Sequence, residues 1–178
     1  SLIVPGDWEG HFYTYQATVS GKQMEETTDP YAKAVGINGK RGMIVDLGKT
    51  NPANWIKDKS PAFKNPTDAI LYELHVRDAS IAGNSGIKNK GKFLGLTENG
   101  TTNPEGLSTG LDHLKEFGVT HIHLLPFYDF YSIDESKPEK LQYNWGYDPL
   151  NYNVPEGSYS TNANDGVTRI RELKQLVK

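Results

Sequence analysis

The pattern of apolar and polar residues changes part-way along the chain. Residues 11–19 alternate aromatic or apolar side chains with polar ones, and the Ser-Gly-Lys stretch at 20–22 is typical of a turn. An Asn-Gly pair at 38–39 precedes a second apolar stretch at 43–47. Short strands separated by turns predict an all-β region, so we expect residues 1–50 to form the closing strands of a β-sandwich.

Residues 51–66 follow a different pattern, which we interpret as a linker. They contain three Pro together with several Asn and Lys, and they show no clear period. Trp55 is the one large aromatic residue in the first half of this stretch, and we expect it to anchor the linker.

From residue 67 the pattern predicts a parallel β-α-β unit. Apolar runs at 69–76 and 119–125 read as strands, and a helix with Ser108 as its N-cap separates them. A second helix begins after Asp165, with apolar residues along one side. The region 67–178 is therefore of the α/β class, with two β/α units.

The two loops that follow the predicted strands are long, at roughly 30 and 38 residues. Both leave the C-terminal end of a parallel strand, and in a β/α barrel that end carries the active site. Loop length and position therefore indicate a ligand cleft at this end of the sheet.

The second loop contains the strongest chemical signal in the chain. Residues 143–149 place Tyr143, Trp145 and Tyr147 around a single glycine. Aromatic rings stack on the C–H faces of sugars, whose hydroxyl groups find polar partners elsewhere. A buried aromatic cluster in an ordinary loop is the alternative interpretation.

This motif, Tyr-Asn-Trp-Gly-Tyr-Asp-Pro at 143–149, resembles the hallmark string of type I pullulanases, debranching enzymes of the α-amylase superfamily of glycoside hydrolases. Residues 70–78 and 120–126 resemble the first two barrel strands of that family. Residues 6–10 and 29–34 resemble the end of the β-sandwich that precedes the barrel. The resemblance spans nearly the whole chain.

The resemblance implies the start of a (β/α)8 TIM barrel, preceded by the rear strands of a carbohydrate-binding-module-like sandwich. It also implies hydrolysis of α-1,6-glucosidic linkages in pullulan, glycogen or starch dextrins by a retaining mechanism. The family's catalytic carboxylates follow later barrel strands, and its Asn-His landmark is absent here. We therefore expect no catalytic residue in this segment, and we expect the remainder of the same polypeptide or a companion fragment to complete the barrel.

By the same resemblance, Tyr147 stacks on the glucose unit at the cleavage point, with core packing as the alternative. Asp148 and Asn144 orient the loop or hydrogen-bond to substrate, although turn capping also explains such residues. Trp145 is interpreted first as a loop anchor and second as a sugar contact. These four residues form the predicted substrate-binding site for an α-glucan.

Two other functions compete with this interpretation. A non-catalytic carbohydrate-binding module would use the aromatic loop alone. A metal hydrolase would use His121 and His123, whose side chains lie on the same face of a predicted strand. No obvious further ligands accompany these two histidines, so we predict no metal site. Asp78, Asp129 and the pair Asp134-Glu135 lie near the predicted cleft, and we expect no catalytic role for them.

The composition limits the classes of binding partner that the chain can have. The formal net charge is −3, without the basic surplus that nucleic acids attract, and no apolar run is long enough for a membrane span. The chain has no Cys, which excludes disulfides and thiolate chemistry. We expect no cofactor, and a structural calcium in the parent enzyme has no identifiable ligands in the sequence. We favour a secreted or cell-surface location over a cytoplasmic one.

Overall fold

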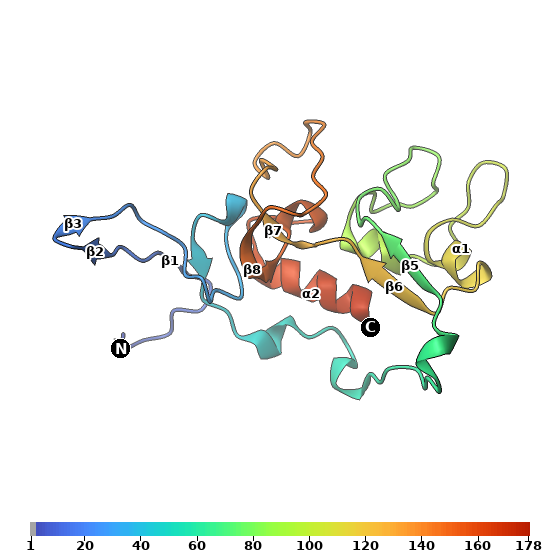
Figure 1. The fold of residues 1–178 in the computed structure, drawn as a ribbon, viewed down its shortest axis with the longest axis horizontal. Coiled ribbons are helices and arrows are strands. Elements are labelled where there is room, and N and C mark those ends of the chain that lie inside the picture. The colour runs from blue at the N-terminus through green and yellow to red at the C-terminus, as the bar shows by residue number, and fades with distance from the viewer. Residues whose placement is uncertain (1–2) are drawn as a thin grey trace.

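The computed structural model describes residues 3–178 and shows a mixed α/β fold with four two-stranded sheets (Figure 1). The strands are β1 (Phe12–Tyr13), β2 (Thr18–Val19), β3 (Lys22–Gln23), β4 (Gly42–Met43), β5 (Leu71–Leu74), β6 (His121–Leu124), β7 (Tyr128–Phe130) and β8 (Pro149–Pro155). The α-helices are α1 (Gly110–Glu116) and α2 (Gly166–Val177). Short 3-10 helices are η1 (Ile37–Gly39), η2 (Leu47–Thr50), η3 (Trp55–Lys57), η4 (Pro66–Asp68), η5 (Phe93–Thr97) and η6 (Gly157–Tyr159).

The N-terminal region contains a hairpin at the turn predicted over residues 20–22, but its strands are shorter than predicted. β2 and β3 pair antiparallel through a turn in which Ser20 and Gly21 have φ values of 51° and 78°. The strand expected over 11–19 was wrong in length, because only β1, a single bridge at Tyr15 and β2 form. This hairpin projects away from the body of the molecule, so no second layer buries one face of a longer strand (Figure 1).

The strand expected over 43–47 was also too long. β4 ends at Met43, and the Asp46 carboxylate then accepts a hydrogen bond from the Gly48 backbone N–H at 2.8 Å. That side-chain cap starts the 3-10 helix η2 where the apolar pattern had suggested continued strand.

The parallel pair β5–β6 confirms the predicted β-α-β unit. Leu71 lies opposite His121 and Leu74 lies opposite Leu124. α1 connects them, and its Leu114 is buried in the same cluster as Leu74. Phe117, at the C-cap of the same helix, is exposed.

The predicted cap of α1 was wrong by one residue. Thr109 is at the N-cap, and its side chain makes no capping hydrogen bond. The Ser108 hydroxyl donates instead to the Glu116 carboxylate at 2.6 Å. The cap of α2 is confirmed, because Asp165 Oδ1 accepts from the Val167 N–H at 3.1 Å.

The main core lies between β5–β6, β7, η5 and α2. Its buried members are Leu74, Val76, Phe93, Leu96, Leu114, Phe130, Ile133 and Tyr159, and Leu173 and Leu176 of α2 pack against them. Tyr159 meets both Phe93 and Phe130 edge-to-face. None of the helices that the structure describes is long and apolar enough to cross a membrane.

Lys174 holds residues 50–55 against α2. Lys174 Nζ donates to Thr50 Oγ1 and Asn51 Oδ1, each at 2.6 Å, and lies 5.5 Å from the centre of the Trp55 ring. Figure 1 shows the chain between β4 and β5 running below α2. Trp55 therefore lies against α2 through its contact with Lys174.

A buried ionic cluster joins the N-terminal region to the rest of the chain. Arg169 Nη1 contacts Asp129 Oδ1 at 2.9 Å, and Arg169 Nη2 contacts Glu135 Oε2 at 2.7 Å. The same Nη2 donates to the Gly36 carbonyl at 3.1 Å. Glu156 is also fully buried, and one of its carboxylate oxygens lies within 4.8 Å of carboxylate oxygens of Asp129 and Glu135.

Candidate functional site

The predicted site residues lie in the loop between β7 and β8, which rises at the top of the view in Figure 1. The Asn144 side chain forms two hydrogen bonds within this loop. Its Oδ1 accepts from the Gly146 N–H at 2.7 Å, and its Nδ2 donates to Asp148 Oδ1 at 2.6 Å. The turn-capping role considered for Asn144 is therefore present in the structure.

Asp148 joins the two ends of the loop. Its Oδ2 accepts from the Ser132 hydroxyl, and its carbonyl accepts from the Tyr131 N–H at 3.2 Å. Desolvation raises the pKa of Asp148, but the hydrogen bonds from Ser132 and Asn144 outweigh it and lower the pKa overall. The group is a fixed carboxylate that holds the loop.

Gly146 allows the loop to approach the end of β6. Its φ is +89°, and a Cβ at this position would lie 2.2 Å from the Pro126 carbonyl oxygen. No side chain fits in that space, so the glycine of the motif is required by geometry.

The three aromatic side chains of the loop are exposed on this fixed backbone. The exposed fractions are 67% for Tyr147, 62% for Trp145 and 48% for Tyr143. Tyr147 is therefore not packed into a core formed by the residues that the structure describes, which was the alternative considered for it. The arrangement offers flat apolar faces beside polar edges, which is what a stacking surface needs.

His75 contacts the loop at Tyr143 and Asn144, although no sequence pattern distinguished it from an ordinary structural histidine. It follows β5 directly and is only 7% exposed. Its Nε2 lies 2.8 Å from the Asn144 carbonyl oxygen, and its ring lies 5.1 Å from the ring of Tyr143. The one sequence signal for it is its position at the C-terminal end of the first parallel strand.

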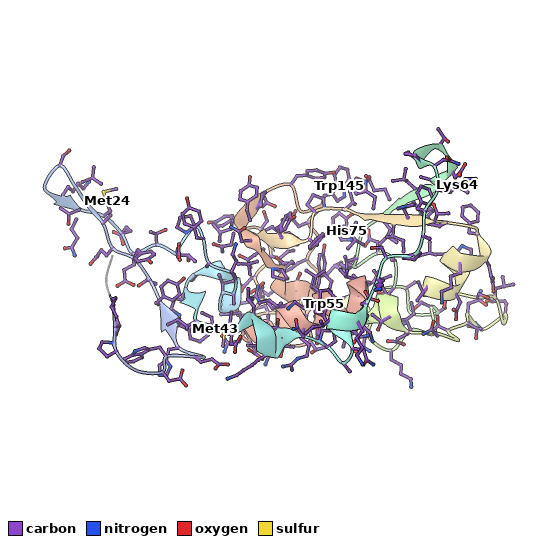
Figure 2. All side chains as sticks on the ribbon, turned by 90° about the horizontal axis from the view of Figure 1, so that it is seen from below. Met24, Met43, Trp55, Lys64, His75 and Trp145 are labelled. Carbon is purple, nitrogen blue, oxygen red and sulfur yellow. The ribbon has the colours of Figure 1, made fainter. Side chains whose placement is uncertain are left out.

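A cavity of about 220 Å³ opens beside the loop. Its lining includes His75, Arg77, Asn144 and Tyr159, but neither Trp145 nor Tyr147. The exposed aromatic surface and the cavity are therefore neighbours that share Asn144. Figure 2 shows Met24 of the projecting hairpin region far from His75 and Trp145, so that region takes no part in the site.

The acidic residues near the predicted cleft are engaged in structural contacts. Asp129 and Glu135 are buried against Arg169, and Arg77 Nη1 donates to Asp78 at 2.8 Å. Hydrogen bonds from the side chains of Lys137, Ser136 and Asn38 hold the pKa of Asp134 well below its usual range.

The predicted histidine alternative is not assembled as a metal site. Among residues 3–178, the only group of three clustered potential ligands is Asp129, Glu135 and Glu156, whose ligand atoms lie within 4.8 Å of one another. His123 Nδ1 instead lies 3.2 Å from Glu73 Oε2, and His121 contacts Thr120.

Comparisons with known proteins agree on one family. No protein-family model matches the chain. The curated pullulanase of Bacillus subtilis (strain 168) is 45% identical over 177 residues, which cover 99% of this chain and 24% of that protein. Pullulanase A of Streptococcus pneumoniae is 34% identical over 96% of this chain and 15% of that protein.

Solved structures give the same result. The pullulanase of Paenibacillus barengoltzii, solved in complex with maltohexaose and α-cyclodextrin, is 56% identical with a TM-score of 0.95. The match covers 98% of this chain and 27% of that one. The pullulanase of Anoxybacillus sp. LM18-11, complexed with maltotetraose, is 48% identical with a TM-score of 0.91 over 98% of this chain and 25% of its own.

The chain thus spans between 15% and 27% of the length of these relatives, and the match extends over almost every residue it has. Its sequence, its backbone and the Tyr143–Pro149 loop all point to the same group. This chain is a homologue of the pullulanases, debranching glycoside hydrolases, over one segment of those enzymes.

Proposed function

We propose that the chain is part of an enzyme that cleaves α-1,6-glucosidic linkages in pullulan, glycogen or starch dextrins. The observation that carries this proposal is the exposed, fixed aromatic loop at residues 143–149, in a segment 56% identical to a pullulanase solved with maltohexaose and α-cyclodextrin. The names of the other relatives support the same activity.

The proposed architecture follows from the parallel pair. β5, α1 and β6 would begin a (β/α)8 barrel, with α2 as the second barrel helix, over residues 67–178. Residues 1–50 would be the rear strands of a preceding sandwich, joined by the linker at 51–66. The parallel register of β5 and β6 and the position of the loop beyond their C-terminal ends support this assignment.

Within that barrel, the segment would supply part of the substrate-binding surface. Tyr147 would stack on a glucose ring, and Trp145 would flank it. Asn144 and Asp148 would hold the loop in place through the hydrogen bonds described above. A stacking contact of this kind contributes about 1 kcal/mol beyond the area that it buries.

The chemistry itself would come from residues outside this chain. In a retaining reaction, a carboxylic acid protonates the glycosidic oxygen and a carboxylate attacks the anomeric carbon to form a glycosyl-enzyme. Water then attacks that intermediate and releases the sugar. The role proposed for this segment is to hold the glucose ring while it distorts towards the transition state.

The test is a substitution of Tyr147 in the natural polypeptide that contains this chain. Tyr147→Ala should lower kcat/KM on pullulan by at least about five-fold, while Tyr147→Phe should retain most of it, because stacking needs the ring. Tyr131→Ala is a matched control, since Tyr131 is exposed in the same loop outside the aromatic motif. Unchanged kcat/KM in Tyr147→Ala would rule out the stacking role.

A second function, a non-catalytic carbohydrate-binding module, is supported by the exposure of the aromatic side chains in this chain alone. Isothermal titration of the 178-residue chain with maltotriose separates the two functions. A binding module should bind the sugar unaided, whereas an enzyme segment should require the rest of the barrel.

A further inference from the structure

His75 is the only buried side chain that connects the end of the parallel sheet to the aromatic loop by both a hydrogen bond and a ring contact, among the residues described. It lies directly after β5, 69 residues before Asn144 in the sequence. The contacts it makes fix the loop at two adjacent residues, Tyr143 and Asn144.

The hydrogen bonds define the protonation of the ring. A carbonyl oxygen can only accept, so the 2.8 Å contact to Asn144 requires a proton on Nε2. The Asp78 backbone N–H donates to Nδ1 at 3.3 Å, so Nδ1 carries no proton. These two contacts correspond to the Nε2–H tautomer of the ring. The Tyr159 hydroxyl, 3.0 Å from Nε2, shares the same proton as a second acceptor.

The ring contact strengthens the same connection. The rings of His75 and Tyr143 lie 5.1 Å apart with a 32° angle between their planes. The Arg77 guanidinium lies 5.7 Å from the centre of the Tyr143 ring. Two residues that follow β5 therefore hold the first residue of the motif.

From Asn144 the contacts continue to both neighbours of Tyr147. The Asn144 side chain accepts from the Gly146 N–H and donates to the Asp148 carboxylate. Tyr147 itself makes no contact with His75. Its backbone is held between two residues whose positions depend on Asn144.

We propose that His75 is a positioning residue for the sugar-binding loop, which orients Tyr147 through a hydrogen bond from Nε2–H to the Asn144 carbonyl. The proposal rests on the proposed function, since it assumes that Tyr147 contacts the glucan. It assigns to the end of the first parallel strand a role in substrate binding without direct contact to substrate.

Two conservative variants distinguish the contributions of the two ring nitrogen atoms of His75. His75→Gln keeps an amide N–H that reaches about as far as Nε2, so it can still donate to Asn144. His75→Asn is shorter and places its amide near the position of Nδ1, so it loses that donor. Both variants should be made in the natural polypeptide that contains the chain, and folding should be checked by circular dichroism and thermal unfolding.

The measurement is the affinity for maltotriose, taken for each variant with Tyr147 intact and with Tyr147→Ala. We expect His75→Asn to weaken binding by about the same five-fold as Tyr147→Ala, and His75→Gln to weaken it less. We also expect His75→Asn to have no further effect when Tyr147 is already Ala, because His75 acts through that ring.

Equal losses in both backgrounds would overturn the proposal, because a merely structural histidine would affect binding whether or not Tyr147 is present. Unchanged affinity in a folded His75→Asn protein would overturn it as well. If His75→Asn does not fold, the cycle is made with His75→Gln, where additive losses would have the same meaning. If Tyr147→Ala alone leaves binding unchanged, the proposed function itself falls and the positioning role falls with it.

Discussion

Asn38 and Glu135, 97 residues apart in the sequence, form a reciprocal pair of hydrogen bonds. The Asn38 N–H donates to Glu135 Oε2 at 2.6 Å, and the Glu135 N–H donates to Asn38 Oδ1 at 2.7 Å. Asn38 Nδ2 also donates to Asp134 at 3.0 Å. No sheet joins η1 to the loop after β7 among the described residues, so these side-chain contacts take the place of strand pairing.

We expect Asn38→Gly to lower the free energy of unfolding by about 1–2 kcal/mol, because two hydrogen bonds from the side chain are lost. Glycine keeps the backbone of this position unstrained at its φ of 56°. Asn54→Gly is a matched control, because Asn54 has a φ of 63° and its side chain makes no capping hydrogen bond. Urea unfolding measures the free energy of unfolding of both variants. An equal decrease in Asn38→Gly and Asn54→Gly would contradict the prediction.

Arg169→Met should destabilise the protein strongly, by about 3–5 kcal/mol, because it leaves Asp129 and Glu135 buried without their cation. Replacing one of the acids as well, in Arg169→Met with Asp129→Asn, should recover part of the loss. Chemical unfolding of both variants measures this. A single variant as stable as the parent would mean that the cluster contributes little to folding.

The stability of the fold should depend on the protonation of Glu156. Burial, followed by the nearby Glu135 carboxylate, raises the pKa of Glu156 from 4.5 to about 8. The folded state therefore holds the proton more tightly than the unfolded state does. The resulting stabilisation is complete below about pH 4.5 and is lost as the pH rises towards about 8.

Glu156→Gln tests this dependence. The variant cannot ionise, so its free energy of unfolding should fall less steeply between about pH 5 and pH 8 than that of the parent protein. Glu139→Gln, which makes the same substitution at an exposed position, is the matched control. Parallel slopes for Glu156→Gln and the parent would show that another group titrates.

Gly146→Ala should displace the aromatic loop and abolish most maltotriose binding, because its new Cβ would lie 2.2 Å from the Pro126 oxygen. Gly100→Ala is the control. Gly100 has a φ of +70° with no atom within 4 Å of a built Cβ, so only backbone strain of about 1 kcal/mol is added. Titration calorimetry and thermal unfolding report the two effects separately, and normal binding by Gly146→Ala would contradict the expected clash.

The elements that the sequence predicted well are those with local signals. The Asp165 cap and the apolar face of α2 depend on residues a few positions apart, and the parallel pairing of β5 and β6 follows from two apolar runs with a helix between them. The predicted strand lengths in residues 11–47 were wrong, because an alternating pattern forms a long strand only where a neighbouring layer buries one of its faces.

The long-range contacts that hold the aromatic loop and the buried ionic cluster could not be predicted in the same way. His75 meets Asn144 across 69 residues, and Arg169 meets Asp129 across 40. A lone histidine or arginine carries no local pattern that identifies its partner. Tyr147 could be singled out because it lies in a motif, whereas the residues that fix its backbone become visible only in the folded chain.

The hydrogen bonds around Asn144 have a thermodynamic consequence for any ligand that stacks on this surface. A loop that must become ordered on binding loses conformational entropy, and that loss weakens affinity. Here the backbone on both sides of Tyr147 is already held by Gly146 and Asp148, so only the two χ angles of the tyrosine remain to be restricted. The loop is preorganised, so a ligand that stacked weakly on Tyr147 would be held there at little entropic cost.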